Sequence, residues 1–203
     1  MKRTFIGIML VFLLCMSVVA GAQSAEEWLD KAGDAIAAGD FEEAKEYCTK
    51  AIEAEPDSAW AYYHRGRVND SLGMLNEAVL DYTKAIELDP GFALHSFRGW
   101  DLYLLGEYER ALEDLNVSIE MDPYELSFLD TRANIYREMG RYDEALADIE
   151  RAIEIYPDRA VVYFTRGLIY RDIGDGERAL ADFTKACDMG DEEACAALEE
   201  SGE

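Results

Sequence analysis

The side chains that most often carry catalysis or bind metal are few in this chain, and their spacing suits neither task. It has 2 His and 4 Cys among 203 residues, without a CxxC or an HExxH spacing. Such spacings hold the ligands of zinc sites. Asp and Glu are so numerous, 43 in all, that a pair of them identifies no catalytic dyad. The sequence therefore predicts no enzyme, no metal site and no cofactor.

The overall charge indicates which classes of binding partner to expect. Lys and Arg number 19 against 43 acidic residues, which gives a formal charge of -24 at pH 7. Phosphate backbones are bound by clustered Lys and Arg, so nucleic acid is not an expected partner. Half of the residues are hydrophobic, which is enough to bury a core and excludes a wholly disordered chain.

Residues 1–22 differ in composition from the rest of the chain. Lys2 and Arg3 precede an almost unbroken apolar run that ends at Ala20, and small residues follow. This pattern predicts a secretory signal peptide cleaved after Ala22. Because the run is near the short end of a membrane-spanning helix, an uncleaved anchor is the alternative. We therefore expect an extracytoplasmic protein, periplasmic or secreted, with no membrane span after cleavage and a membrane anchor only if the leader is retained.

The rest of the chain repeats itself with a period close to 34 residues. Alanines recur at steps of 34, 33, 34 and 34, at Ala44, Ala78, Ala111, Ala145 and Ala179. Glycines recur in the same steps, at Gly39, Gly73, Gly106, Gly140 and Gly174. All four prolines of the chain follow the same period, at Pro56, Pro90, Pro123 and Pro157. Glycine suits the left-handed end of a first helix, and proline ends a second one. Each unit is therefore predicted to be two antiparallel helices joined by a tight turn.

The period, the Gly and Ala positions, the closing Pro and the aromatic positions together resemble the tetratricopeptide repeat. The resemblance covers residues 25–190 as five repeats, at about 25–58, 59–91, 92–125, 126–159 and 160–190, followed by a C-terminal capping helix and tail at 191–203. It implies an all-α fold, a right-handed α-solenoid of five helix-turn-helix repeats. The end repeats depart from the consensus at Lys31, Ala32 and Gly176, which is normal for terminal units.

Further positions recur on the predicted helices. Small residues that allow close helix crossing stand at Gly66, Gly99, Ala133 and Gly167. An Arg precedes each of these small residues, at Arg65, Arg98, Arg132 and Arg166. We expect each Arg to pair with an acidic residue on a neighbouring helix. The alternative is that the four form a row of positive charge that binds ligands. Tyr62, Tyr82, Tyr163 and Phe183 are predicted core residues.

Acidic residues concentrate on the second helices. They alternate with apolar residues at helical spacing and include Asp114 and Asp148. This pattern predicts a solvated convex face. The alternative is a docking surface for a basic partner or for divalent cations, although no calcium-loop spacing occurs.

The resemblance also implies a binding surface. In tetratricopeptide proteins the first helices line a groove that usually holds an extended peptide or a partner helix. The matching positions here are Trp60, Tyr63, Arg67, Trp100, Tyr103, Asn134, Arg137, Phe164 and Arg171. Trp, Tyr and Arg often anchor interfaces, an Arg fork can hold a carboxylate, and an Asn amide can bind a peptide backbone. We therefore expect a non-catalytic scaffold or adaptor for a protein or peptide partner.

Other interpretations stay open at this stage. The Arg side chains can pair along their own helices, and exposed aromatics can bind nothing. A second function is the extracytoplasmic binding of a small anionic ligand, in a pocket made by Trp100, Tyr103 and Arg137. The carboxylate clamp of chaperone-binding relatives is absent, because Leu29 and Gly33 stand where that clamp needs Lys and Asn. The sequence fixes neither the partner nor the oligomeric state.

Two cysteines near the C-terminus are candidates for a disulfide. Cys187 and Cys195 would lie roughly 12 Å apart on one continuous helix, which is too far to bridge. Gly190 interrupts the helix between them, however, and the next residue can cap a new one. The stretch 185–195 also resembles exported helical-repeat proteins whose cysteines at this separation are bridged, and that resemblance implies the disulfide. Cys48 is expected to be a buried, unpaired thiol.

Overall fold

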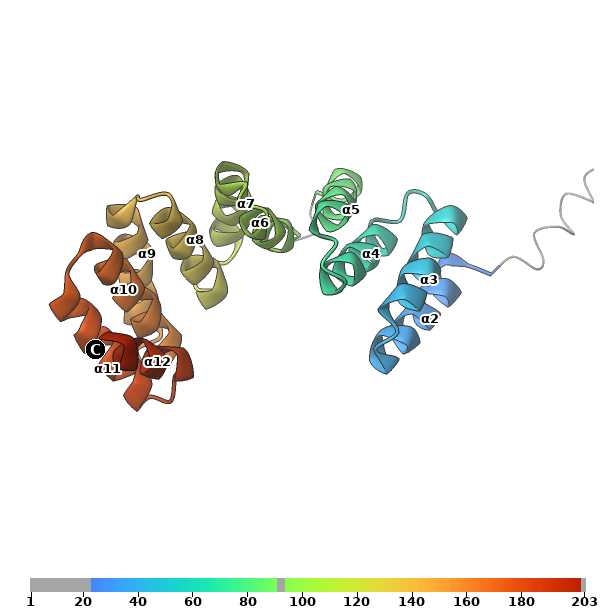
Figure 1. Cartoon of the computed structure of the whole chain (residues 1–203). Helices are drawn as coiled ribbons and strands as arrows, with labels where there is room; N and C mark the ends of the chain where they lie inside the picture. The colour runs from blue at the N-terminus through green and yellow to red at the C-terminus, as the bar shows by residue number, and fades with distance from the viewer. Residues whose placement is uncertain (1–22, 91–93, 202–203) are drawn as a thin grey trace, which may run out of the picture. The chain divides into compact units, whose positions relative to one another are not determined.

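The described part of the chain is helical. A computed structural model describes residues 23–90 and 94–201, and within these ranges it has eleven helices and no strand (Figure 1). The predicted all-α fold of helix-turn-helix repeats is therefore confirmed. The predicted leader, residues 1–22, lies outside the described residues. In the part that is described, no helix combines the length and the apolar character that crossing a membrane requires.

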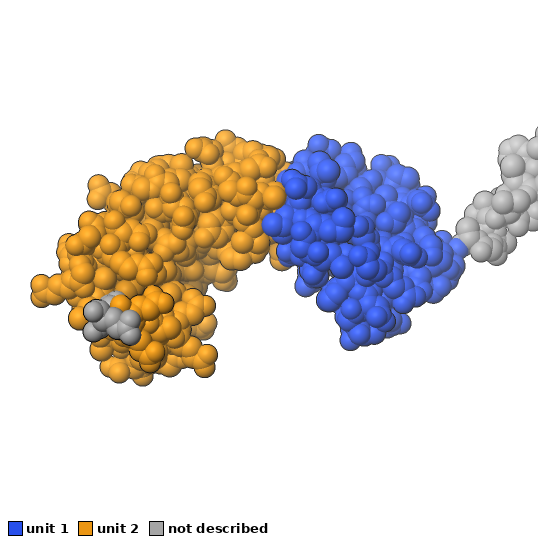
Figure 2. All heavy atoms as spheres, in the orientation of Figure 1, with its two compact units in different colours: residues 1–90 blue, residues 91–203 orange. Residues whose placement is uncertain are grey.

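The helices fall into two compact units, whose boundary in the sequence lies between Pro90 and Gly91 (Figure 2). Unit 1 holds the first two repeats, as α2 (Ala25–Ala38), α3 (Phe41–Ala54), α4 (Ala59–Ser71) and α5 (Leu75–Leu88). Unit 2 holds the next three repeats and one more helix, as α6 (His95–Leu104), α7 (Tyr108–Met121), α8 (Leu126–Glu138), α9 (Tyr142–Ile155), α10 (Ala160–Ile173), α11 (Gly176–Asp188) and α12 (Glu192–Ser201).

Each repeat bends at a glycine in the left-handed region of backbone conformation. Gly140 follows α8 with φ +71°, and its N–H donates to the Arg137 carbonyl oxygen at 2.9 Å. The next N–H, of Arg141, donates to the Tyr136 carbonyl oxygen at 2.8 Å. These bonds satisfy carbonyl groups that the end of a helix leaves without partners. The equivalent glycines also have positive φ, at Gly39, Gly73, Gly106 and Gly174, which confirms the predicted turns.

Small residues set the distance between the two helices of a repeat. At Gly167 of α10, an added Cβ would lie 2.6 Å from ring atoms of Phe183 on α11. At Gly66 of α4, it would lie 2.8 Å from the ring of Tyr82 on α5. Each ring fills the space left by the missing side chain, and both rings are buried. The close crossing predicted at the glycines is therefore confirmed, as are the predicted core positions of the two aromatics; Tyr163 is buried as well. The core prediction was wrong for Tyr62, which is only partly buried because its ring lies beside the Arg65 guanidinium, at 5.6 Å.

A largely buried ion pair joins the two helices in each of the second to fifth repeats. Arginine Nε and Nη2 donate to both oxygens of an aspartate 16 residues later, at 2.7–2.9 Å, in Arg65–Asp81, Arg98–Asp114, Arg132–Asp148 and Arg166–Asp182. Such two-pronged contacts are the strong form of the arginine–carboxylate interaction. Hydrogen bonding to the aspartates raises the pKa of each arginine. The expected pairing is confirmed, and these arginines do not form a row for ligands.

The acidic members of these pairs correct one prediction. Asp114 and Asp148 are 4% and 7% exposed, and so they do not belong to a solvated face. The reason is their orientation on the second helix, because each points toward the arginine of the first helix and away from water. The convex-face prediction was wrong for these two residues.

The first repeat replaces the ion pair by contacts between a cation and aromatic rings. At the positions of arginine and aspartate it has Lys31 and Tyr47. Lys31 Nζ lies 4.4 Å from the centre of the Trp28 ring and 5.9 Å from that of Tyr47, and the two rings stack at 5.8 Å. A cation over an aromatic face is attracted by the quadrupole of the ring. This terminal repeat therefore keeps a cation between its two helices without a buried carboxylate.

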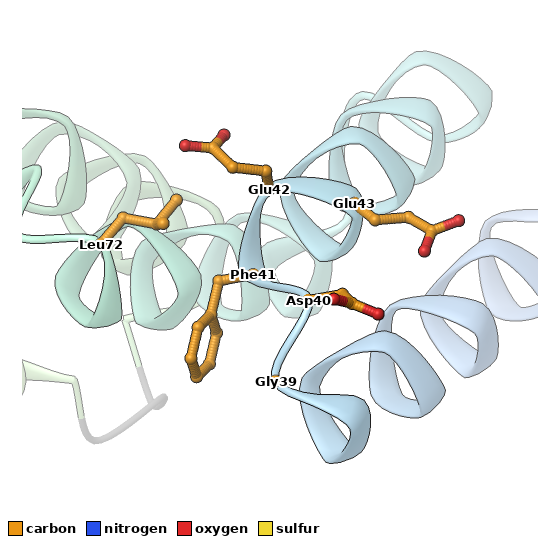
Figure 3. A pocket seen from close by; sticks show the side chains of 6 residues that line it. All are labelled: Gly39, Asp40, Phe41, Glu42, Glu43 and Leu72. Carbon is orange, nitrogen blue, oxygen red and sulfur yellow. The ribbon is translucent and has the colours of Figure 1, made fainter.

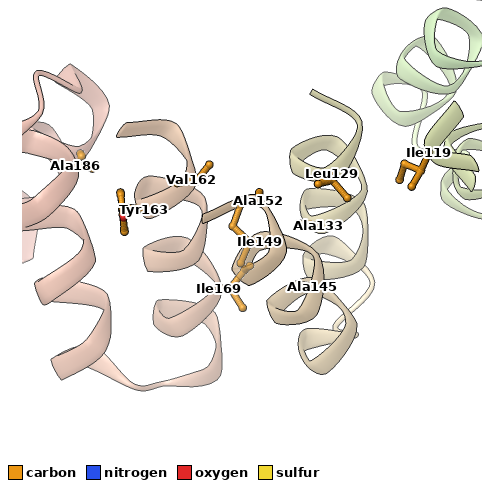
Figure 4. Close-up of a cluster of buried hydrophobic side chains, with 11 residues drawn as sticks. Ile119, Leu129, Ala133, Ala145, Ile149, Ala152, Val162, Tyr163, Ile169 and Ala186 are labelled. Carbon is orange, nitrogen blue, oxygen red and sulfur yellow. The ribbon is translucent and has the colours of Figure 1, made fainter. Parts of the chain in front are cut away.

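A core cluster of unit 2 lies mainly between α8, α9 and α10 (Figure 4). Leu129, Ile149, Val162 and Ile169 are fully buried there, and alanines occupy the close approaches between helices. Burying one such aliphatic side chain contributes about 1.5–3 kcal/mol. Because the cluster includes residues of successive repeats, each of these repeats depends on its neighbour for a closed core.

The helix α12 covers the last repeat of unit 2. Its Ala197 is buried in a cluster with Tyr170 and Phe183. Asp191 caps this helix by accepting a hydrogen bond from the Ala194 N–H at 2.9 Å. A disulfide joins Cys187 to Cys195, with their Cα atoms 4.8 Å apart. The chain can make this bridge because Gly190, with φ +95°, turns it between α11 and α12.

Removing the disulfide is expected to lower the free energy of unfolding by about 2–3 kcal/mol, because the bridge restricts the unfolded chain. The variant carries Cys187→Ser and Cys195→Ser, and urea denaturation followed by circular dichroism measures the loss. Adding a reductant to the wild type should cause a similar loss and should leave the variant unchanged. Equal stability of wild type and variant under oxidising conditions would contradict the prediction.

Cys48 of α3 is the free cysteine of the described residues. It is fully buried and packs with Ala44 and Val68. Burial raises the pKa of its thiol to about 12. Because the thiolate is the reactive form, this cysteine is inert at neutral pH and serves packing.

Candidate functional site

The first helices of unit 2 share one face. Helix α6 contacts α8, and α8 contacts α10, while α7 and α9 each pack against the first helix of the following repeat. The candidate binding residues of α6, α8 and α10 therefore lie on neighbouring helices. In unit 1 the first helices α2 and α4 also contact each other. We call these surfaces the first-helix faces of the two units and describe each separately.

Two aromatic side chains of α6 lie on the first-helix face of unit 2. The rings of Trp100 and Tyr103 lie 5.6 Å apart, and Trp100 is 44% exposed. Burial raises the pKa of Tyr103, and the negative charge of Glu138 on α8 raises it further. The tyrosine therefore lies where α6 meets α8, and the indole beside it remains accessible.

The guanidinium of Arg137 on α8 forms ion pairs with two carboxylates. Its Nη2 donates to Glu138 Oε1 at 2.5 Å, and its Nε lies 3.6 Å from Asp172 Oδ2 on α10. Its side chain is only 13% exposed. An anionic small molecule beside Trp100 and Tyr103 would have to displace these acids. The arrangement therefore disfavours the anionic-ligand alternative.

About two helical turns before Arg137, a polar side chain of α8 contacts α10. Asp130 Oδ1 accepts a hydrogen bond from Thr165 Oγ1 at 2.7 Å. Asn134 Nδ2 donates to the Asp130 carbonyl oxygen at 3.0 Å and lies 3.4 Å from Asp130 Oδ2. The carbonyl oxygen of the Asn134 side chain accepts no hydrogen bond from the described residues. It is therefore available as an acceptor for a peptide N–H.

The two predicted residues of α10 differ in exposure. Phe164 is partly buried against the core, and its ring lies 5.9 Å from that of Phe183. Arg171 is half-exposed, lies over the Phe183 ring at 6.0 Å and makes a 3.8 Å ion pair with Asp172. Phe164 therefore supports the face from beneath, whereas Arg171 lies at its surface.

In unit 1 the predicted residues form a row of rings along α4. Trp60 and Tyr63 lie 5.1 Å apart, and His64 packs edge-on to Trp60 at 4.7 Å. Arg67 lies over the Tyr63 ring at 5.8 Å. Burial lowers the pKa of His64, and the charge of Arg67 lowers it further, so the imidazole is neutral at pH 7. Trp60 is half-exposed at the start of this row.

Two hollows of the surface are lined by none of the predicted binding residues. One in unit 1, of about 530 Å³, is lined by Gly39, Asp40, Phe41, Glu42, Glu43 and Leu72. Figure 3 shows the carboxylates of Glu42 and Glu43 pointing in different directions, so they form no paired acidic site. One in unit 2, of about 460 Å³, opens between α8 and α10 and includes Asp130.

Sequence profiles of the tetratricopeptide repeat match residues 35–58, 59–92 and 125–200, which is well over half of the chain. The chain belongs to the tetratricopeptide repeat family. Hsp70-Hsp90 organizing protein 3 of Arabidopsis thaliana is 33% identical to it over 107 residues, which is 52% of this chain and 19% of that protein. The match therefore spans about a fifth of the length of this curated relative.

Two solved structures share the fold of this tetratricopeptide chain. MamA of Desulfovibrio magneticus RS-1 has a TM-score of 0.77 and 20% identity, over 87% of this chain and 96% of its own. YrrB, described as a tetratricopeptide protein with an unusual peptide-binding site, has a TM-score of 0.76 and 23% identity, over 92% of this chain and 97% of its own. At such identities these likenesses establish the architecture alone.

Sequence reasoning missed several neighbours of the predicted residues. Asp172, which pairs with Arg137, and Thr165, which donates to Asp130, both come from α10. His64 extends the ring row of α4. Each lies at a tetratricopeptide position that varies between repeats, so the repeat pattern carried no signal for it.

Proposed function

We propose that this tetratricopeptide chain is an exported, non-catalytic adaptor that holds an extended segment of a partner protein on its first-helix faces. The observation that carries the proposal is the exposure of two indoles, Trp60 at 50% and Trp100 at 44%. Each lies one turn from a tyrosine that packs against it, at Tyr63 and Tyr103. Large rigid aromatics that bury their area only on binding are common interface anchors.

The neighbouring polar groups suit a peptide more than a small anion. On unit 2, the Asn134 carbonyl oxygen is available to a backbone N–H, while Arg137 is already paired with acids. Leu29 and Gly33 replace the Lys and Asn of the carboxylate clamp, so we do not propose the chaperone partners that the name of the Arabidopsis relative suggests. The description of YrrB as peptide-binding supports the peptide class of ligand.

Two features support export. Residues 1–22 have the composition of a cleaved leader, and a disulfide joins Cys187 to Cys195. Structural disulfides persist mainly in oxidising compartments outside the cytoplasm. Fusing residues 1–30 to a reporter that is active only outside the cytoplasm tests this part of the proposal, and an inactive fusion would contradict it.

Selection from a displayed library of random 12-residue peptides tests the binding function. Trp100→Ala should weaken the peptides selected on unit 2 by about 30-fold or more, because an anchoring indole contributes at least about 2 kcal/mol. Trp60→Ala tests unit 1 in the same way. Leu180→Ala is the matched control, since Leu180 is 49% exposed on a second helix. Selected peptides that bind all variants equally would contradict the proposal.

A further inference from the structure

The hollow between the starts of α8 and α10 has the features of a pocket for one side chain. It measures about 460 Å³, and we call it the Asp130 hollow; its lining residues are Glu125, Leu126, Ser127, Asp130, Tyr156, Arg159 and Val161. Leu126, Tyr156 and Val161 offer apolar surface, whereas Glu125, Ser127 and Asp130 offer oxygen acceptors. Arg159 is the one cation among these lining residues, beside the two carboxylates of Glu125 and Asp130. The combination suits a ligand group with a long apolar stem and a polar head.

The carboxylate of Asp130 is the unusual group in this hollow. Burial raises its pKa, although the hydrogen bond from Thr165 and the charge of Arg137 oppose that effect. One oxygen accepts the short hydrogen bond from Thr165, and the other has only the 3.4 Å contact with Asn134. A desolvated carboxylate with one good hydrogen bond is costly to keep charged.

Asp130 itself is only partly buried, whereas the aspartates of the arginine pairs are buried and show how the fold compensates such groups. Asp148 and its equivalents each receive two hydrogen bonds from an arginine of the same repeat. Asp130 forms no ion pair within residues 23–90 and 94–201. The nearby Arg137 is engaged by Glu138 and Asp172. The fold therefore leaves at Asp130 a negative charge that a positively charged ligand group would stabilise.

We propose that the Asp130 hollow receives a lysine side chain of the bound partner segment, with its ammonium on Asp130. This inference rests on the peptide-binding function, because Asp130 lies one turn from Asn134 on the same face of α8. An ammonium group can donate to Asp130 Oδ2, to the Ser127 hydroxyl and to Glu125, and its four-carbon stem can pack on Leu126 and Val161.

Lysine fits this place better than arginine. A guanidinium binds a carboxylate best through two parallel hydrogen bonds, which need both oxygens. Thr165 already occupies Oδ1 of Asp130. The compact ammonium makes single contacts with separate acceptors, which is how the oxygens of this hollow are arranged. The net charge of -24 also favours a basic partner.

The test uses the full chain and the peptides that it selects from the random 12-residue library. Peptides selected by unit 2 should contain a lysine whose replacement by norleucine weakens binding by about 30-fold or more. Asp130→Asn should weaken the lysine peptide by a similar factor and leave the norleucine peptide nearly unchanged. Asp143→Asn is the control for general electrostatics, since Asp143 is exposed on the second helix α9.

The outcomes separate this inference from the proposed function. Selected peptides without a required lysine, a preference for arginine, or an equal effect of Asp143→Asn would overturn the lysine pocket while leaving peptide binding intact. Failure to select any peptide would overturn both. The comparison of lysine and norleucine peptides uses the unaltered protein. It therefore shows whether binding needs the lysine ammonium even if Asp130→Asn changes the folding of unit 2.

Discussion

Replacing Arg132 by methionine is expected to lower the free energy of unfolding by about 3–5 kcal/mol. Arg132 donates to both oxygens of Asp148 at 2.7 Å, and the side chains are 17% and 10% exposed. The methionine keeps the apolar stem but leaves the buried carboxylate without its cation. Asn116 Oδ1, 2.7 Å from Arg132 Nη1, loses its donor as well. Urea denaturation at pH 7, followed by circular dichroism, measures the loss.

Two further variants show whether the cost comes from the unpaired charge. Arg132→Met combined with Asp148→Leu should recover most of the stability, because an apolar pair of similar volume leaves no buried charge. Arg141→Met breaks an exposed pair with Glu144 and should cost far less. A loss at Arg132 no greater than that at Arg141 would show that the pair contributes little to the fold.

The regular spacing of these pairs explains how far the sequence alone could predict the fold. Glycine, alanine and proline recur at one residue per repeat, and each has one local reason for its place. The helix-turn-helix unit therefore followed from the repeat. The constant interval of 16 residues between each Arg and its Asp was also present in the sequence, and it would have moved Asp114 and Asp148 from the solvated face into the pairs.

The candidate site was less predictable, because its contacts join residues that do not recur. Asp130 meets Thr165 across 35 residues, and Arg137 meets Asp172 on the next first helix. Both contacts depend on how α8 and α10 are rotated against each other, which apolar periodicity describes only coarsely. The sequence could place Arg137 on the face, but only the packing of α10 reveals that its charge is already paired.

Replacing Phe183 by alanine is expected to lower the free energy of unfolding by about 3–5 kcal/mol, through lost burial and the cavity that remains. Phe183 is 1% exposed, and it belongs to the cluster that α12 covers. Thermal and urea denaturation measure the effect. Leu180→Ala on the same helix, at an exposed leucine, is the matched control and should cost much less. Equal losses would contradict the assignment of Phe183 to the core.

Gly167 faces this ring. The change in stability when a glycine is replaced by alanine should have opposite signs at Gly167 and at a helical glycine with free space around it. Alanine normally stabilises a helix by about 0.5–1 kcal/mol over glycine, and Gly33→Ala should show that gain, since an added Cβ there meets nothing within 4 Å. Gly167→Ala should instead destabilise, because its Cβ would lie 2.6 Å from the Phe183 ring. In a Phe183→Leu background the space opens, and Gly167→Ala should become neutral or stabilising. The same loss in both backgrounds would mean that the glycine serves the backbone of α10 and not the close approach of α11.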